Sequence, residues 1–191
     1  RGEVMNDIKI IELFFKRDTR AISESKNKYG KYCFTIANNI LSNFEDSEEC
    51  LNDTLFHSWN TIPPTKPNIL RLFLAKITRN LAFNKFKAKT TQKRGGGQIE
   101  LVLDELSECI TDNKDVLDQI IAKELGETIN KFLLDLSIRE RNRSCRRYFF
   151  VESTSIIAKR YNLTENNVKV ILSRTRNKLR EFLIKEGYFY E

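Results

Sequence analysis

The chain is poor in the residues that interrupt helices and in those that bind metals. Its 191 residues include only seven glycines, three prolines and one histidine, His57. Glycine and proline are the strongest breakers of regular structure, and long segments of this chain repeat their apolar residues every three or four positions. The sequence therefore predicts a fold that is nearly all helix. With a single histidine and no closely spaced pair of cysteines, the spacings typical of zinc sites are missing, and we expect neither a metal nor a cofactor.

Cysteines and long apolar runs are also scarce. The four cysteines, Cys33, Cys50, Cys109 and Cys145, lie far apart in the chain. We expect them to be reduced thiols that pack as small apolar groups, as is usual in the cytoplasm. No segment approaches the roughly 18 to 20 unbroken apolar residues of a membrane span, and no secretory signal is visible. The sequence thus predicts a cytoplasmic protein without membrane insertion.

What the chain has in excess is positive charge. Its 33 lysines and arginines outnumber 26 aspartates and glutamates, which gives a net charge of +7. Residues 137–180 contain twelve basic and only three acidic residues, a local net charge of +9. Charge of one sign concentrated over so short a stretch favours the phosphate backbone of a nucleic acid, ahead of an acidic membrane surface.

Residues 153–183 have the pattern of two helices joined by a tight turn. The first helix is expected over residues 154–161. Asn162 then breaks the pattern, because asparagine tolerates the left-handed conformation that such turns require. Thr164 is a good N-cap for the second helix, whose apolar residues recur at spacings of three and four. This is the geometry of a helix-turn-helix, whose second helix fits the major groove of DNA.

The second of these helices has a polar and strongly basic outer face. Asparagine side chains suit base edges, whereas lysine and arginine side chains also suit phosphates. A simpler alternative is an ordinary pair of amphipathic helices whose basic face is only solvated. From the N-cap onward, this face is formed by Thr164, Glu165, Asn166, Asn167, Lys169, Ser173, Arg174, Arg176, Lys178 and Arg180.

The N-terminal half is expected to contain a short helix over residues 5–15, a longer helix that ends near Leu41, and a third helix over residues 44–62. The start of the third helix is loaded with negative charge, and an acidic surface on a basic protein is a natural place for another protein to dock. The alternative is ordinary helix chemistry, because the helix dipole favours acidic side chains at an N-terminus. The acidic residues are Glu45, Asp46, Glu48, Glu49 and Asp53.

A loop at residues 62–68, which contains Pro63, Pro64 and Pro67, separates this segment from a strong helix over residues 69–89. Asn80 and Asn84 lie one turn apart on the same side of that helix. They could hydrogen-bond base edges or simply face water. The polar residues that we single out on the helix are Lys76, Arg79, Asn80, Asn84 and Lys85.

Residues 90–97, TTQKRGGG, have the composition of a flexible linker. The stretch that follows, residues 100–118, holds seven acidic residues and one lysine. An acidic linker between two basic modules resists collapse onto DNA and could occupy a channel built for nucleic acid, although it could equally serve to solubilise the chain. We therefore expect an all-α fold of two small helical domains, residues 1–89 and 116–191, joined by a flexible acidic linker at residues 90–115.

The second module is expected to begin near Val116 with a helix that ends at Leu136. Ser137 is placed to cap the next helix, and Glu140 is in position to complete a capping box. The helix-turn-helix follows after the turn at residues 151–153.

Two linked all-helical modules of this kind resemble the RNA polymerase sigma factors of the sigma-70 family, in the small extracytoplasmic-function (ECF) subfamily. The resemblance covers about residues 5–185. FEDSEECLNDTLFHSWNTI is similar to the family's acidic helix that binds the clamp of the largest polymerase subunit. LFLAKITRNLAFNKFKAK is similar to the segment that melts and recognises the −10 element. LSIRERNRSCRRYFFVESTSIIAKRYNLTENNVKVILSRTRNKLREFL is similar to the −35-binding module, which implies a winged-helix-like helix-turn-helix domain.

The resemblance implies a promoter-specificity subunit and not an enzyme. The partners that it implies are bacterial core RNA polymerase, promoter DNA and an anti-sigma factor. The residues that it implies for polymerase binding are Asp46, Glu49, Asn52, Asp53, Phe56 and Trp59. Those implied for the −10 element are Lys76, Arg79, Asn80, Asn84 and Lys85. Those implied for the −35 element are Thr164, Glu165, Asn166, Asn167, Lys169, Ser173, Arg174, Arg176 and Lys178.

The chain departs from the family pattern at several positions. Asn162 stands where the family usually has glycine, and Phe73 and Asn84 replace a common tryptophan and a common aspartate. Arg143 and Ser144 lie where the family usually has apolar core residues. We therefore expect a thin apolar face on the helix that carries them.

Two other classes of protein stay open. The first is a helix-turn-helix transcriptional regulator that acts without core polymerase; such proteins usually dimerise, and this sequence has no evident dimerisation helix. The second is an enzyme such as a nuclease. The sequence has no carboxylate cluster with metal-binding spacing and no nucleophile–base pair, and the glycines at 95–97 lack the Lys-Ser/Thr of a P-loop.

Overall fold

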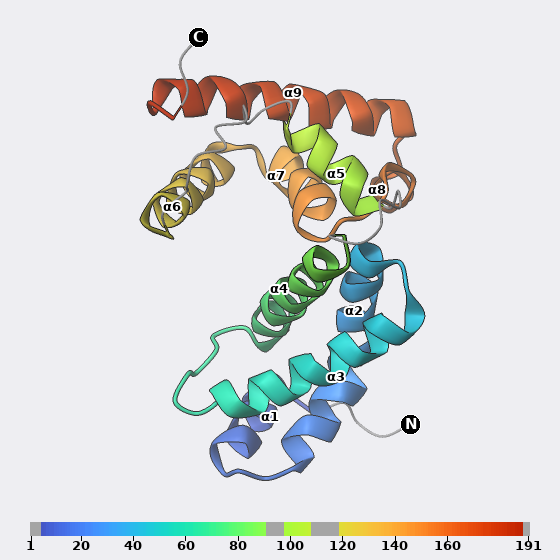
Figure 1. Cartoon of the computed structure of the whole chain (residues 1–191), viewed down its shortest axis with the longest axis vertical. Coiled ribbons are helices and arrows are strands. Elements are labelled where there is room, and N and C mark those ends of the chain that lie inside the picture. The colour runs from blue at the N-terminus through green and yellow to red at the C-terminus, as the bar shows by residue number, and fades with distance from the viewer. Residues whose placement is uncertain (1–4, 91–97, 108–118, 189–191) are drawn as a thin grey trace. The chain divides into compact units, whose positions relative to one another are not determined.

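The computed structural model describes residues 5–90, 98–107 and 119–188. The chain divides into two compact units, Arg1–Gly97 and Gln98–Glu191. The described residues form helices and turns without any strand, so the expected all-α fold class is confirmed for them. Figure 1 shows these helices along the chain.

The described part of the first unit has four helices. They are α1 (Asp7–Phe15), α2 (Arg20–Leu41), α3 (Phe44–Thr61) and α4 (Leu70–Thr90). Helices α2, α3 and α4 pack against one another in all three pairs, and α1 packs against α2. The bounds agree with the helices expected from the apolar spacing to within about two residues, which is the usual uncertainty of helix ends.

Local chemistry marks the point where α2 ends and α3 begins. Ser42 takes a left-handed conformation with φ of 50°, which stops α2. Asn43 then caps α3, because its side-chain oxygen accepts a hydrogen bond from the Asp46 N–H at 2.9 Å. This cap stabilises the first turn of α3. Glu45 and Asp46 lie in that turn, at the positive end of the helix dipole.

The core of the first unit lies between these helices. Burying each large apolar side chain contributes roughly 1.5–3 kcal/mol to folding. Within this core, the hydroxyl groups of Thr54 and Thr78 are hydrogen-bonded at 3.1 Å, which ties α3 to α4. The charged residues of α3 and α4 lie outside this core. Buried side chains of this core include Phe14, Cys33, Leu51, Leu55, Leu70 and Leu74.

The second unit is built along its longest helix, α9. The elements of this unit are α5 (Gln98–Ser107), α6 (Gln119–Asp135), α7 (Ile138–Ser144), the π-helical turn η1 (Cys145–Phe149), α8 (Thr154–Tyr161) and α9 (Glu165–Lys185). The C-terminal half of α9 packs on α6, where Phe132 and Leu136 meet Leu179 and Leu183. The N-terminal half packs on α8. Its core residues there are Ile157, Ala158, Val168 and Leu172.

Helices α8 and α9 are joined by a short turn whose geometry follows from three polar residues. The Ser153 hydroxyl accepts a hydrogen bond from the Ile156 N–H at 3.3 Å and begins α8. Asn162 has φ of 51° and ψ of 52°, in the left-handed region that ends a helix. The Thr164 hydroxyl accepts from the Asn167 N–H at 3.2 Å and begins α9. The bounds of α8, the left-handed residue and the N-cap of α9 are all as predicted.

The helix α7 begins at a capped residue and is then supported by an unexpected stacking contact. The Ser137 hydroxyl accepts from the Glu140 N–H at 3.3 Å and donates to the Glu140 carboxylate at 2.7 Å. Ser144 is buried, and the Arg143 guanidinium lies 5.0 Å from the centre of the Tyr161 ring. The apolar face of α7 is thus thin, as expected: Ser144 is its only buried residue, and Arg143 makes a cation–π contact with Tyr161.

Part of the segment expected to be a flexible linker is helical. Residues 98–107 form α5 and belong to the second unit. The helix follows from apolar residues at spacings of three and four, of which Ile99 and Val102 are buried. The rest of the expected linker, residues 91–97 and 108–115, lies outside the described residues.

Four further expectations concern a wing, the cysteines, the start of the second module and membrane insertion. The winged-helix-like character of the second unit stays a prediction, since the described residues contain no strand that could form a wing. Cys33, Cys50 and Cys145 are free thiols, and Cys109 lies outside the described residues, as does the expected start of the second module at Val116. No helix in the described ranges combines the length and apolarity needed to cross a membrane.

Candidate nucleic-acid interface

The outer face of α9 carries most of the residues that were predicted to contact a −35 element. Val168 and Leu172 point into the core against α8, and this fixes which positions of the helix face outward. The exposed polar residues on the N-terminal half are Glu165, Asn166, Asn167, Lys169 and Arg174. They supply amide groups in the first turn and basic groups further along the helix, the side-chain types that bind base edges and phosphates.

Other residues of the predicted set are engaged within the protein. The Thr164 hydroxyl is used as the cap of α9, and the Glu165 carboxylate accepts from the Thr154 hydroxyl at 3.4 Å. The Lys178 ammonium group binds the Glu140 carboxylate at 2.6 Å. Ser173 and Arg176 are half-buried. The predicted surface thus has intramolecular partners at both ends, at Thr164 and Glu165 and again at Arg176 and Lys178. Its exposed residues between them are Asn166, Asn167, Lys169 and Arg174.

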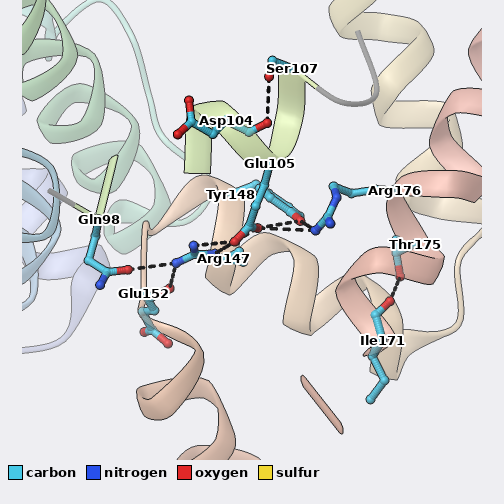
Figure 2. Close-up of polar contacts among 10 residues, drawn as sticks. All are labelled: Gln98, Asp104, Glu105, Ser107, Arg147, Tyr148, Glu152, Ile171, Thr175 and Arg176. Carbon is cyan, nitrogen blue, oxygen red and sulfur yellow. Dashed lines mark hydrogen bonds and ion pairs between the residues drawn. The ribbon is translucent and has the colours of Figure 1, made fainter. Parts of the chain in front are cut away.

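A cluster of polar side chains lies beside α9, centred on the Glu105 carboxylate of α5 (Figure 2). The Arg147 Nη2 and Nε atoms lie 2.6 and 3.2 Å from Glu105 Oε1, a two-pronged contact. The Tyr148 hydroxyl donates to Glu105 Oε2 at 3.1 Å and accepts from Arg176 Nη1 at 3.0 Å. Arg176 Nη1 itself lies 3.5 Å from Glu105 Oε2. One carboxylate therefore joins Arg147 and Tyr148 of η1 to Arg176 of α9.

A cavity of about 470 Å³ adjoins this cluster. From α9 it is lined by Lys169, Ser173 and Arg176, and from α5 by Gln98, Leu101 and Glu105. The three α9 residues are spaced by four and three positions, so they form one stripe along the helix. All three belong to the predicted −35 contacts, and they line the same cavity as α5.

Helix α4 presents a second polar stripe. Lys76, Asn80 and Asn84 follow one another at intervals of four residues and are all exposed. Arg79, beside this stripe, places its guanidinium 4.4 Å from the centre of the Phe83 ring. The structure therefore brings four of the five predicted −10 residues to neighbouring positions on α4.

Lys85, the fifth, lies on another side of α4. Its ammonium group is 3.4 Å from Asp46 Oδ1 and also binds the Glu49 carboxylate. Lys89, one turn later, binds Asp46 as well. Two residues predicted to bind polymerase are thus ion-paired to the C-terminal part of α4.

The remaining residues of the predicted polymerase surface share the outer face of α3. Asp53 and Phe56 are exposed, Phe56 to 66%. Asn52 is exposed too, and its side-chain oxygen accepts from the Lys26 ammonium at 3.4 Å. Trp59 is half-buried beneath the Arg17 guanidinium, which lies 5.3 Å from its ring centre. This face combines one carboxylate, one amide and an exposed aromatic ring, a mixture suited to binding another protein.

The ionisation of these groups follows from their partners. Hydrogen bonds from Lys89 and then Lys85 lower the pKa of Asp46 below its ordinary value. Hydrogen bonds from Lys178 and Ser137 lower the pKa of Glu140. Burial raises the pKa of the Tyr148 phenol, which keeps its hydroxyl protonated and able to donate to Glu105.

Four residues that matter in these clusters were not singled out from the sequence: Lys89, Glu105, Arg147 and Tyr148. Arg147 was counted only for its charge, and Glu105 only as part of an acidic segment. Glu105 could have been found from the helical spacing of the apolar residues around it, which predicts a helix in that segment. No group of three or more potential metal ligands occurs in the part of the chain that the structure describes.

Neither a scan of protein-family models nor a search of curated proteins finds a match to this chain. What the chain does is therefore inferred from its own residues and their geometry.

Proposed function

We propose that this chain is an RNA polymerase sigma factor of the extracytoplasmic-function type, which directs core polymerase to specific promoters. The observation that carries the proposal is the exposed polar face of α9. This face points outward because the apolar side of α9 packs on α8 within the helix-turn-helix. A second polar stripe on α4 and an exposed face on α3 belong to the other unit, which supports a chain with more than one binding task.

In this proposal α9 enters the major groove of the −35 element. Asn166, Asn167 and Lys169 lie in its first two turns, where a recognition helix usually meets base edges. Arg174 is exposed one turn later and is placed to bind a phosphate or a guanine edge. The exposed members of the basic set between 137 and 180, such as Lys169 and Arg174, supply the electrostatic part of the binding.

The first unit then acts on the −10 element and on the polymerase. Lys76, Asn80 and Asn84 on α4 would contact an opened DNA strand, where unstacking one base costs a few kcal/mol that such contacts offset. Asp53 and Phe56 on α3 would dock on the polymerase. Because Asp46 and Glu49 are paired with lysines of α4, the polymerase would have to exchange those partners to use them.

The partners of the chain in this proposal are bacterial core RNA polymerase and promoter DNA, with an anti-sigma factor as regulator. The chain acts in the cytoplasm and has no enzymatic activity of its own.

Run-off transcription with purified core polymerase on a library of promoter fragments tests this function. We expect a subset of fragments to be transcribed only when the chain is added, and the chain to co-elute with core polymerase. The result against the proposal is a chain that forms a tight dimer at sedimentation equilibrium and binds DNA by sequence but ignores core polymerase. That outcome would identify a helix-turn-helix regulator that acts without the polymerase.

A further inference from the structure

Helix α5 lies on the same side of the second unit as the stripe of α9 that carries Lys169, Ser173 and Arg176. The cavity lined by these residues is also lined by Gln98, Leu101 and Glu105 of α5. A DNA duplex that lay along this stripe would have to occupy space beside α9 that α5 borders. The position of α5 therefore bears directly on how α9 can approach DNA.

The groups that bind the Glu105 carboxylate are of the kind that bind phosphates. The Arg147 guanidinium binds both oxygens of Glu105, with Nη2 at 2.6 Å from Oε1 and Nε at 3.2 Å from each oxygen. Two-pronged binding of this kind is shared by carboxylates and phosphates, because both offer paired anionic oxygens to the planar guanidinium. Tyr148 adds a hydroxyl donor at 3.1 Å and Arg176 a second guanidinium at 3.5 Å. Figure 2 shows all three donors converging on this one side chain.

The buried position of the Arg147 guanidinium requires an anionic partner. Arg147 is only 2% exposed, and its Nη1 atom is held by the Gln98 side chain and the Glu152 carbonyl, both at 3.0 Å. A guanidinium so placed is strongly destabilised if its anionic partner is removed without replacement. An anion that displaces Glu105 therefore has to supply equivalent oxygens, as a DNA phosphate does.

We propose that Glu105 occupies, within the chain, a binding site for a backbone phosphate of DNA formed by Arg147, Tyr148 and Arg176, so that α5 competes with DNA for the helix–turn–helix module. This inference rests on the proposed DNA-binding function and adds to it a competitor within the chain, the Glu105 carboxylate. Duplex binding at this face requires the Glu105 contacts to break, and the free chain binds DNA more weakly than the same chain without the carboxylate.

The test compares the full-length chain with Glu105→Gln and Asp104→Asn. Both variants remove one negative charge from the same helix, so they raise the net charge equally. Asp104 is exposed and points away from Arg147 in Figure 2, which makes it the matched control. The probe is a short fluorescein-labelled duplex of random sequence, titrated by anisotropy over a series of salt concentrations. We expect Glu105→Gln to bind about three- to tenfold more tightly than the wild type, and Asp104→Asn to stay within about twofold of it.

Hydrogen exchange on the wild-type chain gives a second measurement that does not depend on how well Glu105→Gln folds. Adding the duplex is expected to speed exchange in residues 98–107 and to slow it in residues 165–176. Equal affinities for all three chains, or an α5 whose exchange is unchanged when the duplex is bound, would overturn the competition while leaving DNA binding by α9 intact. Failure of all three chains to bind the duplex at any salt concentration would instead overturn the proposed function itself.

Discussion

The Lys85 ammonium group lies 3.4 Å from the Asp46 carboxylate, and this pair joins a residue predicted to hold promoter DNA to a residue predicted to bind polymerase. Glu49 and Lys89 extend the pair into a small network between the start of α3 and the end of α4. Within the first unit, two of the carboxylates at the start of α3, those of Asp46 and Glu49, are thus paired with lysines of α4. The exposed carboxylate of Asp53, further along α3, becomes the stronger candidate for docking on a partner.

Asp53→Lys is expected to abolish co-elution of the chain with core polymerase. The substitution reverses the charge at the centre of the exposed face of α3, beside Phe56, and like charges across an interface cost several kcal/mol. Analytical size-exclusion chromatography with core polymerase measures the effect. The control is Glu12→Lys, which makes the same charge change at an exposed position of α1. If Asp53→Lys co-elutes as well as the control does, α3 is not the docking surface.

The Asp46 ion pairs are expected to make part of the stability of the first unit dependent on acid. The pKa of Asp46 is lowered in the folded chain, so its contribution is present above the ordinary pKa and is lost as pH falls through the folded value. Because the pairs lie near the surface, we expect Asp46→Asn to cost about 0.5–1 kcal/mol near neutral pH. That difference should shrink below about pH 4.

Urea unfolding of Asp46→Asn and the wild type at several pH values provides the measurement. Glu12→Gln, at an exposed position on α1, serves as the control for loss of one carboxylate. A constant gap between the Asp46→Asn and wild-type curves across the acid range would show that the ion pairs are not its source.

Arg174→Ala is expected to weaken binding to duplex DNA. The side chain is exposed on the outer face of α9, and loss of one phosphate contact should lower the slope of log affinity against log salt by about one. Anisotropy titrations in a salt series measure both quantities. Lys131→Ala, which removes an exposed basic residue of α6, is the control. Identical slopes for Arg174→Ala and the wild type would assign the side chain to a base edge or to solvent.

The left-handed conformation of Asn162 gives a prediction about the turn between α8 and α9. Asn162→Ala is expected to lower the free energy of unfolding by about 1 kcal/mol, because a Cβ without a compensating polar group is disfavoured at φ of 51°. Asn162→Gly should be tolerated, since glycine adopts this conformation readily. Chemical denaturation measures both, with Asn130→Ala on the exposed side of α6 as the control. Equal losses for Asn162→Ala and Asn162→Gly would mean that the backbone conformation is not the cause.

The predictions made from the sequence were most accurate where the physics is local. Ser137 and Thr164 were identified as places where helices begin, and each does accept the expected hydrogen bond from the following turn. Asn162 was identified as the left-handed residue for the same reason. A cap depends on residues no more than four positions away, so its signal is complete within a short stretch of sequence.

Sequence patterns were less informative about partners that are distant in the chain. Lys85 was grouped with Asn80 and Asn84 because all three lie on one helix, yet its side chain binds α3. Arg143 was expected to lie on a thin apolar face, and it does, but its stacking partner, the Tyr161 ring of α8, was not foreseen. Both outcomes depend on the crossing of two helices, which helical periodicity alone does not specify.

By itself, the amino-acid sequence determined that this chain is helical, where most of its helices begin and end, and which face of α9 is polar. Those properties follow from backbone propensity, capping and apolar spacing, which act over a few residues. Only the tertiary structure decided that α5 is part of the second unit, that Glu105 binds Arg147 across 42 positions of the chain, and that Asp46 and Glu49 of α3 bind lysines of α4. The reason is that many oppositely charged residues of this chain could pair equally well. Which of them do so depends on which side chains the folded helices bring within reach of one another.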